Sequence, residues 1–484
     1  MKALPVISAA AGDLGIVDDD HFHDECGVFG IFPHPEAARI TYLGLYGLQH
    51  RGQEAAGIAV ALDGKISLHK GEGYVNEVFN SAQLALLPGN AAIGHCRYST
   101  AGESALVNAQ PVFARTTKGP LALAHNGNIT NAGRLRAEME AAGAIFQTSS
   151  DSEVILHLMA RASAEDPVEA LIEAWKQTEG AFSCVVLLAD KVIAVRDPRG
   201  FRPLVLGRLE DKAYVVASET CAFDLIDARL LREIEPGELV EISATGVRSL
   251  RPFDVKPVSP CIFEHIYFAR PDSLVFGRYV MDSREQLGRI LAREQPAQAD
   301  LVIPVPDSGI GAGLGFSHES GIPFAFGLIR NHYVGRTFIQ PQQAIRDLAV
   351  RVKLNPVRPL IEGKRVVLID DSIVRGTTSR KIVRLVRAAG AREVHLRISS
   401  PPTTGPCHYG IDTPKKSELI AAQHSVEEIR RFVEADSLGY LSLQAIEDAI
   451  ARGKPFCKAC FDGKYPVEPD FAPHQSGLFE KSAR

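Results

Sequence analysis

Two neighbouring carboxylates, Asp370 and Asp371, directly follow a short apolar run at residues 366–369. The aliphatic, β-branched run predicts a strand buried on both faces, as in a parallel sheet. The small and hydroxyl residues of 372–378 then lead into helical apolar spacing over 379–389. Carboxylates at a strand end bind sugar hydroxyls or Mg²⁺, and a helix N-terminus binds phosphate. The pattern therefore indicates a phosphorylated-sugar site. A mere acidic turn is the alternative, disfavoured because buried carboxylates are costly without partners.

A second candidate is Cys26, which follows an acidic leader and opens the glycine-containing apolar run 26–32. A lone cysteine is more often a small buried hydrophobe than a nucleophile. If residues 1–25 are a propeptide that is removed, Cys26 becomes the N-terminal residue. Its α-amine would then titrate near pH ~8 and could serve as the base for the thiol. The sequence thus predicts an N-terminal nucleophile of the kind that uses its own amine.

Polar clusters follow Cys26 at the ends of predicted elements. Asn126-Gly127 could be only a hairpin turn, and Asp151 only a helix cap. Several such clusters after a glycine-flanked cysteine are less easily explained by turns alone. The clusters are 47–54 at the end of a helix from about Pro35, 94–100 and 125–128 at the ends of apolar strands, and 148–153 at a helix start.

The second half of the chain repeats the strand-then-turn pattern. An apolar strand at 301–305 leads into Asp307, Ser308 and Gly309, which could also be only a tight turn and helix cap. Residues 336–355 mix Thr, Gln, Pro and Arg without periodicity, so they are predicted to form a loop, either a connector or a lid over the site.

Four cysteines form a third candidate site. Cys457 and Cys460 have the spacing of a ligand pair, whereas Cys261 and Cys407 stand apart. A zinc ribbon normally shows two such pairs, and a redox pair would leave the other two cysteines unexplained. Four thiolates from three segments could hold zinc or an iron–sulfur centre. The remaining cysteines, Cys96, Cys184 and Cys221, are interpreted as packing residues.

The whole chain sets outer limits on these interpretations. At 484 residues it is too long for one core, so two or three domains are expected. A net charge of −5 without long basic runs argues against nucleic-acid binding, and no stretch is apolar enough for a membrane span. The acidic start of the chain resembles neither a secretory signal nor a transit peptide, so a cytoplasmic location is predicted.

The run 366–378 resembles the 5-phosphoribosyl-1-pyrophosphate (PRPP) motif of type I phosphoribosyltransferases. The resemblance implies a Mg²⁺ ion held by Ser308, Asp370 and Asp371. It also implies a lid in 336–355 that closes over PRPP. The PRPP-binding residues so implied are Asp307, Ser308, Gly309, Arg336, Lys353, Asp370, Asp371, Ser372, Arg375, Gly376, Thr377 and Thr378.

Cys26 and the clusters that follow it resemble the glutaminase domain of class II glutamine amidotransferases, the N-terminal-nucleophile type. The resemblance implies that Cys26 attacks the glutamine amide and that Asn126 and Gly127 form the oxyanion hole. Glutamine would be bound by Arg97 through its carboxylate, by Asp151 through its ammonium group, and by Arg51 as a further contact.

Together the two resemblances imply a fold of mixed α/β and α+β class. An αββα glutaminase would occupy 26–255. A doubly wound α/β phosphoribosyltransferase with iron–sulfur-binding extensions would occupy 256–470, before a polar tail at 471–484. The surroundings of Cys261, Cys407, Cys457 and Cys460 resemble the iron–sulfur branch of enzymes with this domain pair, which implies a [4Fe–4S] cluster.

The implied reaction transfers ammonia from glutamine to PRPP, giving 5-phosphoribosylamine, glutamate and pyrophosphate, and it begins purine biosynthesis. The family also implies feedback inhibition by purine nucleotides and a homotetramer. Two alternatives are another amidotransferase of the same glutaminase class and a non-catalytic PRPP-sensing regulator. The phosphoribosyl motif disfavours the first. The second needs no N-terminal cysteine and normally has a basic surface for nucleic acid.

Overall fold

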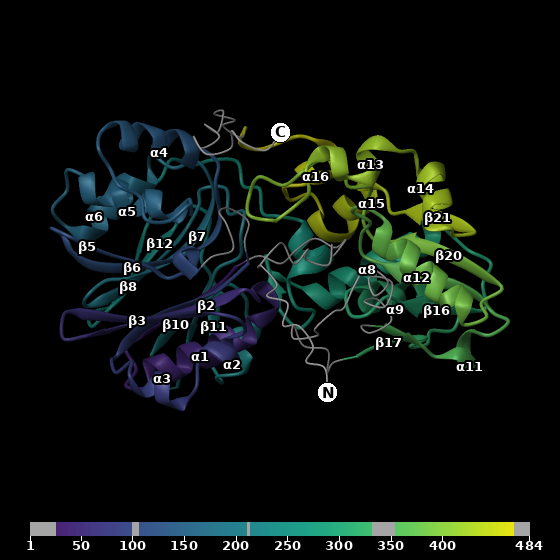
Figure 1. Cartoon of the computed structure of the whole chain (residues 1–484), viewed down its shortest axis with the longest axis horizontal. Helices are drawn as coiled ribbons and strands as arrows, with labels where there is room; N and C mark the ends of the chain where they lie inside the picture. The colour runs from purple at the N-terminus through teal and green to yellow at the C-terminus, as the bar shows by residue number, and fades with distance from the viewer. Residues whose placement is uncertain (1–25, 99–105, 211–212, 332–353, 469–484) are drawn as a thin grey trace, which may run out of the picture.

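The computed structural model describes residues 26–98, 106–210, 213–331 and 354–468. Two antiparallel sheets use residues 27–250, and a parallel sheet uses residues 301–440 (Figure 1). The predicted propeptide, the predicted polar tail, Arg336 and Lys353 lie outside the described residues.

Within the described residues, the first half contains a seven-stranded and a six-stranded sheet, both antiparallel. The first sheet has the order β11 (Arg229–Glu233), β9 (Val205–Arg208), β10 (Tyr214–Ala217), β1 (Gly27–Phe32), β4 (Ala91–Arg97), β2 (Ala55–Leu62) and β3 (Lys65–Glu72). The second has the order β13 (Gly246–Leu250), β12 (Leu239–Ser243), β8 (Lys191–Arg196), β7 (Gly180–Leu187), β6 (Gly119–Ile129) and β5 (Val112–Thr116).

The two sheets pack face to face because both faces of their central strands are apolar. In β1, Phe29 and Ile31 pack against the helix α1 (Ala37–Gly47), whereas Val28 and Phe32 face the second sheet. Successive side chains of a strand point to opposite faces, so one apolar run can fill two cores. In Figure 1, α1 lies below the sheets and α5 and α6 lie above them. The first half is therefore the predicted αββα sandwich.

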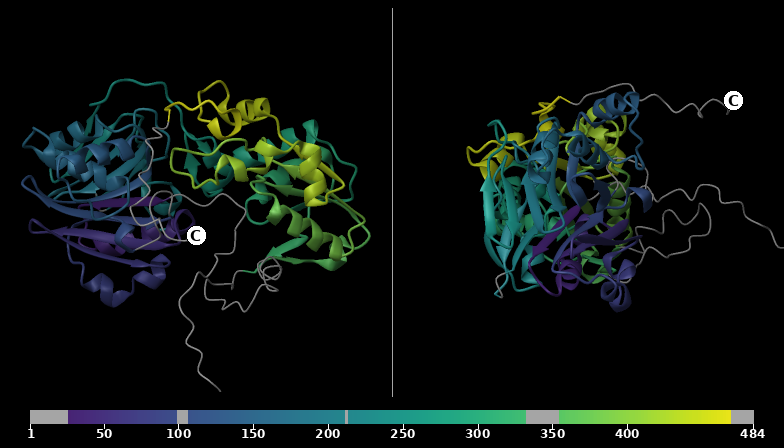
Figure 2. Two further views of the ribbon diagram at one scale, coloured as in Figure 1. Left: turned by 45° about the horizontal axis from the view of Figure 1, so that its top comes forward. Right: turned by 90° about the vertical axis from the view of Figure 1, so that its left-hand side faces the viewer.

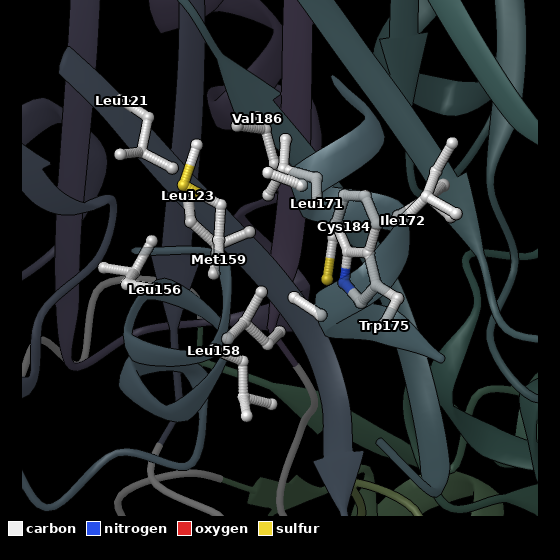
Figure 3. Packing of buried hydrophobic residues seen from close by; sticks show 14 of the residues in the cluster. Leu121, Leu123, Leu156, Leu158, Met159, Leu171, Ile172, Trp175, Cys184 and Val186 are labelled. Atoms are coloured by element: carbon white, nitrogen blue, oxygen red, sulfur yellow. The ribbon is translucent and has the colours of Figure 1, made fainter. Parts of the chain in front are cut away.

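The outer core of this half lies under α5 (Ser152–Arg161) and α6 (Pro167–Trp175). The side chains of Leu121 and Leu123 from β6 lie beside Met159 there, and Trp175 lies beside Cys184 of β7, all fully or nearly fully buried (Figure 3). Smaller helices complete this half: η1 (Gln49–Arg51), α2 (Val75–Val78), α3 (Ser81–Ala85), η2 (Leu106–Asn108), α4 (Ala132–Ala141) and α7 (Cys221–Asp224).

The second half is built on a parallel sheet with helices on both faces. The described strands have the order β16 (Leu301–Pro304), β19 (Arg365–Asp370), β20 (Glu393–Ile398) and β21 (Ser437–Tyr440). Val367 and Ile369 pack under α8 (Val280–Glu294) and α9 (Gly309–Ser320). Val366 and Leu368 pack under α12 (Thr377–Ala388) and α14 (Val426–Val433). This two-sided burial confirms the doubly wound fold predicted from residues 366–369.

Short elements surround this sheet, and the C-terminal ones lie on the side that faces the two-sheet half (Figure 1; Figure 2, left). No helix among the described residues is both long and apolar enough to cross a bilayer. The short elements are η3 (Glu264–Phe268), β14 (Leu274–Val275), β15 (Arg278–Tyr279), β17 (Leu328–Arg330), β18 (Leu354–Pro356), α11 (Arg358–Ile361), η5 (Lys416–Glu418), α13 (Ile420–Gln423), α15 (Leu443–Ile446), η6 (Glu447–Ala451) and α16 (Ala459–Asp462).

Candidate active sites

Cys26 lies at the start of β1, buried, with its thiol donating to the carbonyl of Tyr98 at 3.4 Å. The next residue has no room for a side chain, since a Cβ at Gly27 would lie 2.7 Å from Sγ of Cys96. Burial raises the pKa of Cys96 to about 12, so Cys96 is a protonated packing thiol beside the candidate nucleophile. Cys96 thus has the packing role that the sequence predicted, and the nucleophilic role of Cys26 stays a prediction.

Arg97, the predicted carboxylate ligand, is the last residue of β4 and is almost fully buried. The cluster 94–100 was predicted to end an apolar strand, and β4 continues through Arg97 because it pairs along this stretch with β1 and β2. The segment before β2 packs closely on Arg97, since a Cβ at Gly52 would lie 2.6 Å from the backbone nitrogen of Arg97. Sheet pairing and this close contact hold Arg97 in place.

Strand β6 carries the predicted oxyanion residues. The sequence indicated that the strand ends at Ala124, but it runs on to Ile129 because β7 pairs with it along its whole length. The hairpin-turn alternative for Asn126-Gly127 is therefore wrong. Gly127 has a φ of +142°, and a Cβ there would lie 2.2 Å from the carbonyl oxygen of Ala181 in β7. Only glycine fits at this position.

On its edge away from β7, β6 pairs with β5 as far as Leu123, and beyond that point its N–H groups meet side chains and not a strand. His125 donates its N–H to the Gln110 side chain at 2.8 Å, and Ile129 donates to Asp151 at 2.8 Å. In an antiparallel strand alternate residues point to the same edge, so the N–H of Gly127 lies between these two donors and faces the same side. That orientation suits a backbone donor of an oxyanion hole.

The side-chain amide of Asn126 is fully buried, and neither its oxygen nor its nitrogen has a hydrogen-bond partner among the described residues. A buried amide without partners costs ~1–3 kcal/mol. Such a group is retained where a ligand completes it, as an oxyanion would. This is the strongest local sign of a binding site in the first half.

Asp151 precedes α5 but does not cap it, because one carboxylate oxygen accepts the N–H of Ile129 and the other approaches Ser152 at 3.3 Å. Asp151 therefore occupies the predicted N-cap position, but its carboxylate makes no capping hydrogen bond to the helix among the described residues. The carboxylate ties α5 to the oxyanion strand, and its predicted contact with a substrate ammonium group stays a prediction.

Arg51 lies in a buried ion-pair network that joins the two halves. Its guanidinium contacts the carboxylates of Glu219 and Glu264. Glu264 also accepts from Arg202 at 3.3 Å. Burial raises the pKa of Glu219, but the charges of Arg51 and His50 outweigh that effect and hold it below its usual range. Arg51 therefore has structural partners in both halves, and its predicted contact with glutamine stays a prediction.

In the second half, Asp370 ends β19 and accepts the N–H of Asp371 at 3.0 Å. Both carboxylates are buried. One oxygen of Asp371 accepts from the Ser372 hydroxyl, and the other has no hydrogen-bond partner among the described residues. A buried carboxylate oxygen without a donor fits a cation ligand, so the donor set suits Mg²⁺.

The predicted pyrophosphate loop lies directly beside this acid pair. Val305 donates to the carbonyl of Ile369 at 2.8 Å, and a Cβ at Gly309 would lie 2.3 Å from that same oxygen. Ser308 takes the position before the first residue of α9, so the helix N-terminus opens next to Asp370. Asp307 is more exposed and pairs with Arg330 at 2.6 Å. The carboxyl ends of both strands therefore meet, as predicted.

The turn after the acid pair has the predicted form. Gly376 adopts a φ of +81° just before Thr377 begins α12, with Thr378 next in the helix. The N-terminus of α12 therefore begins at this turn, and the backbone N–H groups of a helix N-terminus suit a phosphate. Arg375 turns to Glu418 at 2.8 Å.

The four predicted cluster cysteines are brought together from their three segments. Cys261 and Cys457 pair through their backbones, and Cys407 accepts an N–H at 3.3 Å from Tyr409. Burial raises the pKa of Cys460 well above its usual value, and the charges of Cys261, Cys457 and Cys407 raise it further. Mutual repulsion of thiolates is removed by a bound metal or cluster. The four thiols therefore fit such a group.

Sequence reasoning missed the carboxylates Glu219 and Glu264 and the cation Arg202. All three are buried charges, which are rarely buried without partners. No local pattern marks them, because their partners lie in other elements. His50, Glu219 and Cys221 have ligand atoms within 4.8 Å of one another, a spacing that could hold a metal ion. Arg51 pairs with Glu219, so this group is explained as part of the ion-pair network.

Two family models match this chain. A glutamine amidotransferase domain model matches residues 95–224, and a phosphoribosyl transferase domain model matches residues 291–400. Among solved structures, one described as the allosteric regulatory enzyme of purine biosynthesis superposes with a TM-score of 0.89. It is 50% identical, with 92% of this chain and 97% of that chain covered.

A second solved structure is glutamine PRPP amidotransferase from B. subtilis complexed with ADP and GMP. Its TM-score is 0.88 at 49% identity, with 92% of this chain and 98% of that one covered. The curated amidophosphoribosyltransferase of Bacillus subtilis is 51% identical over 92% of this chain and 95% of its own length. The chloroplastic enzyme of Vigna aconitifolia is 54% identical over 94% and 93%. The chain belongs to the amidophosphoribosyltransferase family.

Proposed function

We propose that this chain releases ammonia from glutamine at Cys26 and transfers it to PRPP at the Asp370–Asp371 site. The products are 5-phosphoribosylamine, glutamate and pyrophosphate, and the step is the first committed one in purine biosynthesis. The observation that carries the proposal is the pairing in one chain of a cysteine-headed αββα sandwich with a parallel sheet whose strand end holds the acid pair.

In the glutaminase half, the thiol of Cys26 adds to the side-chain carbonyl of glutamine. The negative charge that develops on the oxygen is taken up by the Asn126 amide and the Gly127 N–H. Ammonia leaves with the proton supplied by the α-amine of processed Cys26, and water hydrolyses the resulting thioester to glutamate. Arg97 and Asp151 hold the substrate carboxylate and ammonium groups, with Arg51 as a further contact.

In the transferase half, ammonia attacks C1 of the ribose while pyrophosphate leaves. The acid pair orients the ribose, the 372–378 turn binds the 5′-phosphate, and the loop at 307–309 faces the pyrophosphate. A Mg²⁺ ion held by Asp370, Asp371 and Ser308 would neutralise the charge of the leaving group. The predicted contacts of Arg336 and Lys353 remain part of this proposal.

We further propose that Cys261, Cys407, Cys457 and Cys460 hold a [4Fe–4S] cluster with a structural role. It would tie the C-terminal segment to the transferase core. Support comes from the burial of Cys261 and Cys457, the partial burial of Cys407 and Cys460, and the effect of the other three thiols on the pKa of Cys460. The domain boundary near residue 255, a homotetramer and a cytoplasmic location also remain proposals. Feedback inhibition by purine nucleotides is supported by the relative solved with ADP and GMP.

The decisive experiment measures pyrophosphate release from PRPP and Mg²⁺ by anaerobically purified protein, first with glutamine and then with ammonium. The proposal expects release with both donors. Cys26→Ala should lose only the glutamine reaction, and Asp371→Asn should lose both. No release with either donor, from protein with a free Cys26 terminus, would contradict the transferase assignment and favour the PRPP-sensing alternative.

A further inference from the structure

The segment that carries Cys407 packs directly against the oxyanion strand of the other half. A Cβ at Gly410 would lie 2.8 Å from Cα of Gly127 and 2.9 Å from its carbonyl carbon. One residue further along β6, the side-chain amide of Asn128 donates to the carbonyl of His408 at 3.0 Å. Gly127 is therefore clamped between Ala181 of β7 and Gly410 of the second half.

The segment itself is held firmly in place. Arg202 donates to the carbonyl of Tyr409 at 2.9 Å, and the Tyr409 ring stacks on Phe201 with centroids 4.2 Å apart. The Tyr409 hydroxyl donates to the carbonyl of Val467 at 2.6 Å. The Tyr409 N–H donates to the sulfur of Cys407. A shift of Cys407 is thereby passed to the backbone that touches Gly127.

We propose that residues 407–410 are a positioning element of the glutaminase site. They set the backbone of Gly127, and with it the N–H that completes the oxyanion hole. The four-cysteine site of the second half thereby makes the glutaminase competent, through contact and not through the substrates. This inference rests on the proposed function of Cys26, Asn126 and Gly127, and assigns residues 408 and 410 a role in it.

The clearest probe is the γ-aldehyde analogue of glutamate. The Cys26 thiol adds to its carbonyl, forming a C–S bond while the thiol proton passes to the oxygen, with no change of oxidation state. The adduct oxygen occupies the oxyanion hole. Alkylation of Cys26 by iodoacetamide places no oxygen on the carbon bonded to sulfur. Iodoacetamide therefore reports the reactivity of the thiol, whereas the aldehyde also reports the geometry of the oxyanion hole.

Gly410→Ala should weaken binding of the aldehyde at least ~10-fold, and lower glutamine-dependent turnover toward the ~10²-fold loss seen when one oxyanion donor is removed. Iodoacetamide labelling and ammonia-dependent pyrophosphate release should be unchanged. Gly463→Ala is the matched control, since Gly463 also has a positive φ, of +70°, but none of the described residues has an atom within 4 Å of a Cβ there.

Asn128→Ala removes the hydrogen bond to His408 without introducing a clash, and should weaken the aldehyde adduct in the same direction by a smaller factor. If Gly410→Ala fails to fold, Asn128→Ala alone tests the positioning role of residues 407–410. Aldehyde binding by both variants equal to that of Gly463→Ala would overturn the positioning role. A wild-type protein that binds the aldehyde but releases no pyrophosphate with either donor would refute the proposed transferase function and leave the positioning role standing.

Discussion

Arg51 and Glu264 form a buried ion pair that connects the nucleophile-bearing sandwich to the first helical turn of the transferase half. Arg51 follows the helix that packs on β1, and Gly27 lies against it, since a Cβ there would be 3.5 Å from Cβ of Arg51. Glu264 shares its carboxylate with Arg202, whose guanidinium also binds the carbonyl of Tyr409. One network of charges thus touches Gly27, the residue after the candidate nucleophile, as well as the interface and the cysteine-bearing segment.

Removing one member of this network should be costly. Glu264→Gln leaves Arg51 and Arg202 buried beside a neutral group, and breaking a buried pair typically costs ~3–5 kcal/mol. We expect a clear drop in the thermal unfolding midpoint. Arg39→Ala is the control, because its pair with Glu36 is exposed and such pairs contribute ~0.2–1 kcal/mol. An equal drop in the unfolding midpoint of both variants would contradict the prediction that the buried network stabilises the fold.

The unpartnered amide of Asn126 makes a different prediction. Asn126→Ala should lower glutamine-dependent turnover by ~10²–10³, because one donor to the oxyanion is lost. Turnover with ammonium should persist. The same variant should be no less stable than the wild type, because it removes a buried amide that has no hydrogen-bond partner among the described residues. Steady-state kinetics with both donors, together with a thermal melt, check both parts, and a destabilised variant would show that the amide has an internal partner.

His95 predicts how stability depends on pH. Burial, together with the smaller effect of the Arg97 charge, lowers the pKa of His95 from 6.5 to about 3, against the opposing hydrogen bond to the carbonyl of His125. His95 therefore binds a proton near pH 6.5 in the unfolded chain but only near pH 3 in the folded chain. Stability should fall as pH is lowered through this window, by up to about 1.4 kcal/mol per pH unit from this group.

His95→Gln keeps a hydrogen-bonding side chain but cannot take up the proton, so its urea midpoint should fall less between pH 7 and pH 5 than that of the wild type. His424→Gln is the control, since His424 is exposed on the second half. A wild-type loss that His95→Gln leaves unchanged would show that other groups dominate the acid response.

The elements around the acid pair could be predicted because their signals are local. The apolar run 366–369 marks a strand buried on both faces, and Gly376 marks the left-handed turn before α12. The ends of β4 and β6 could not be predicted, because Arg97 and Gly127 are held in strands by pairing with distant neighbours. Polar residues at the end of an apolar run look like a turn until their partner strand is known.

The contacts between halves were also beyond the sequence. The network of Arg51, Glu219 and Glu264 joins residues more than 160 positions apart, and the contact of Gly127 with Gly410 joins residues still farther apart. The family resemblance predicted a substrate contact for Arg51 from its position in the 47–54 cluster alone. Which charge a buried guanidinium pairs with depends on the packing of the two halves, and no motif records that.

The four-cysteine site can be tested by composition and by protease. Cys460→Ser should lose iron and acid-labile sulfide together with the visible absorption of the protein, because one of four thiolate ligands is gone. Residues 457–468, which Cys457 ties to Cys261, should then become sensitive to protease. Cys184→Ala is the control, since Cys184 is a buried thiol of the sandwich core. Zinc in place of iron in the wild type, or unchanged protease resistance after complete loss of the cluster, would contradict the structural role proposed for a [4Fe–4S] centre.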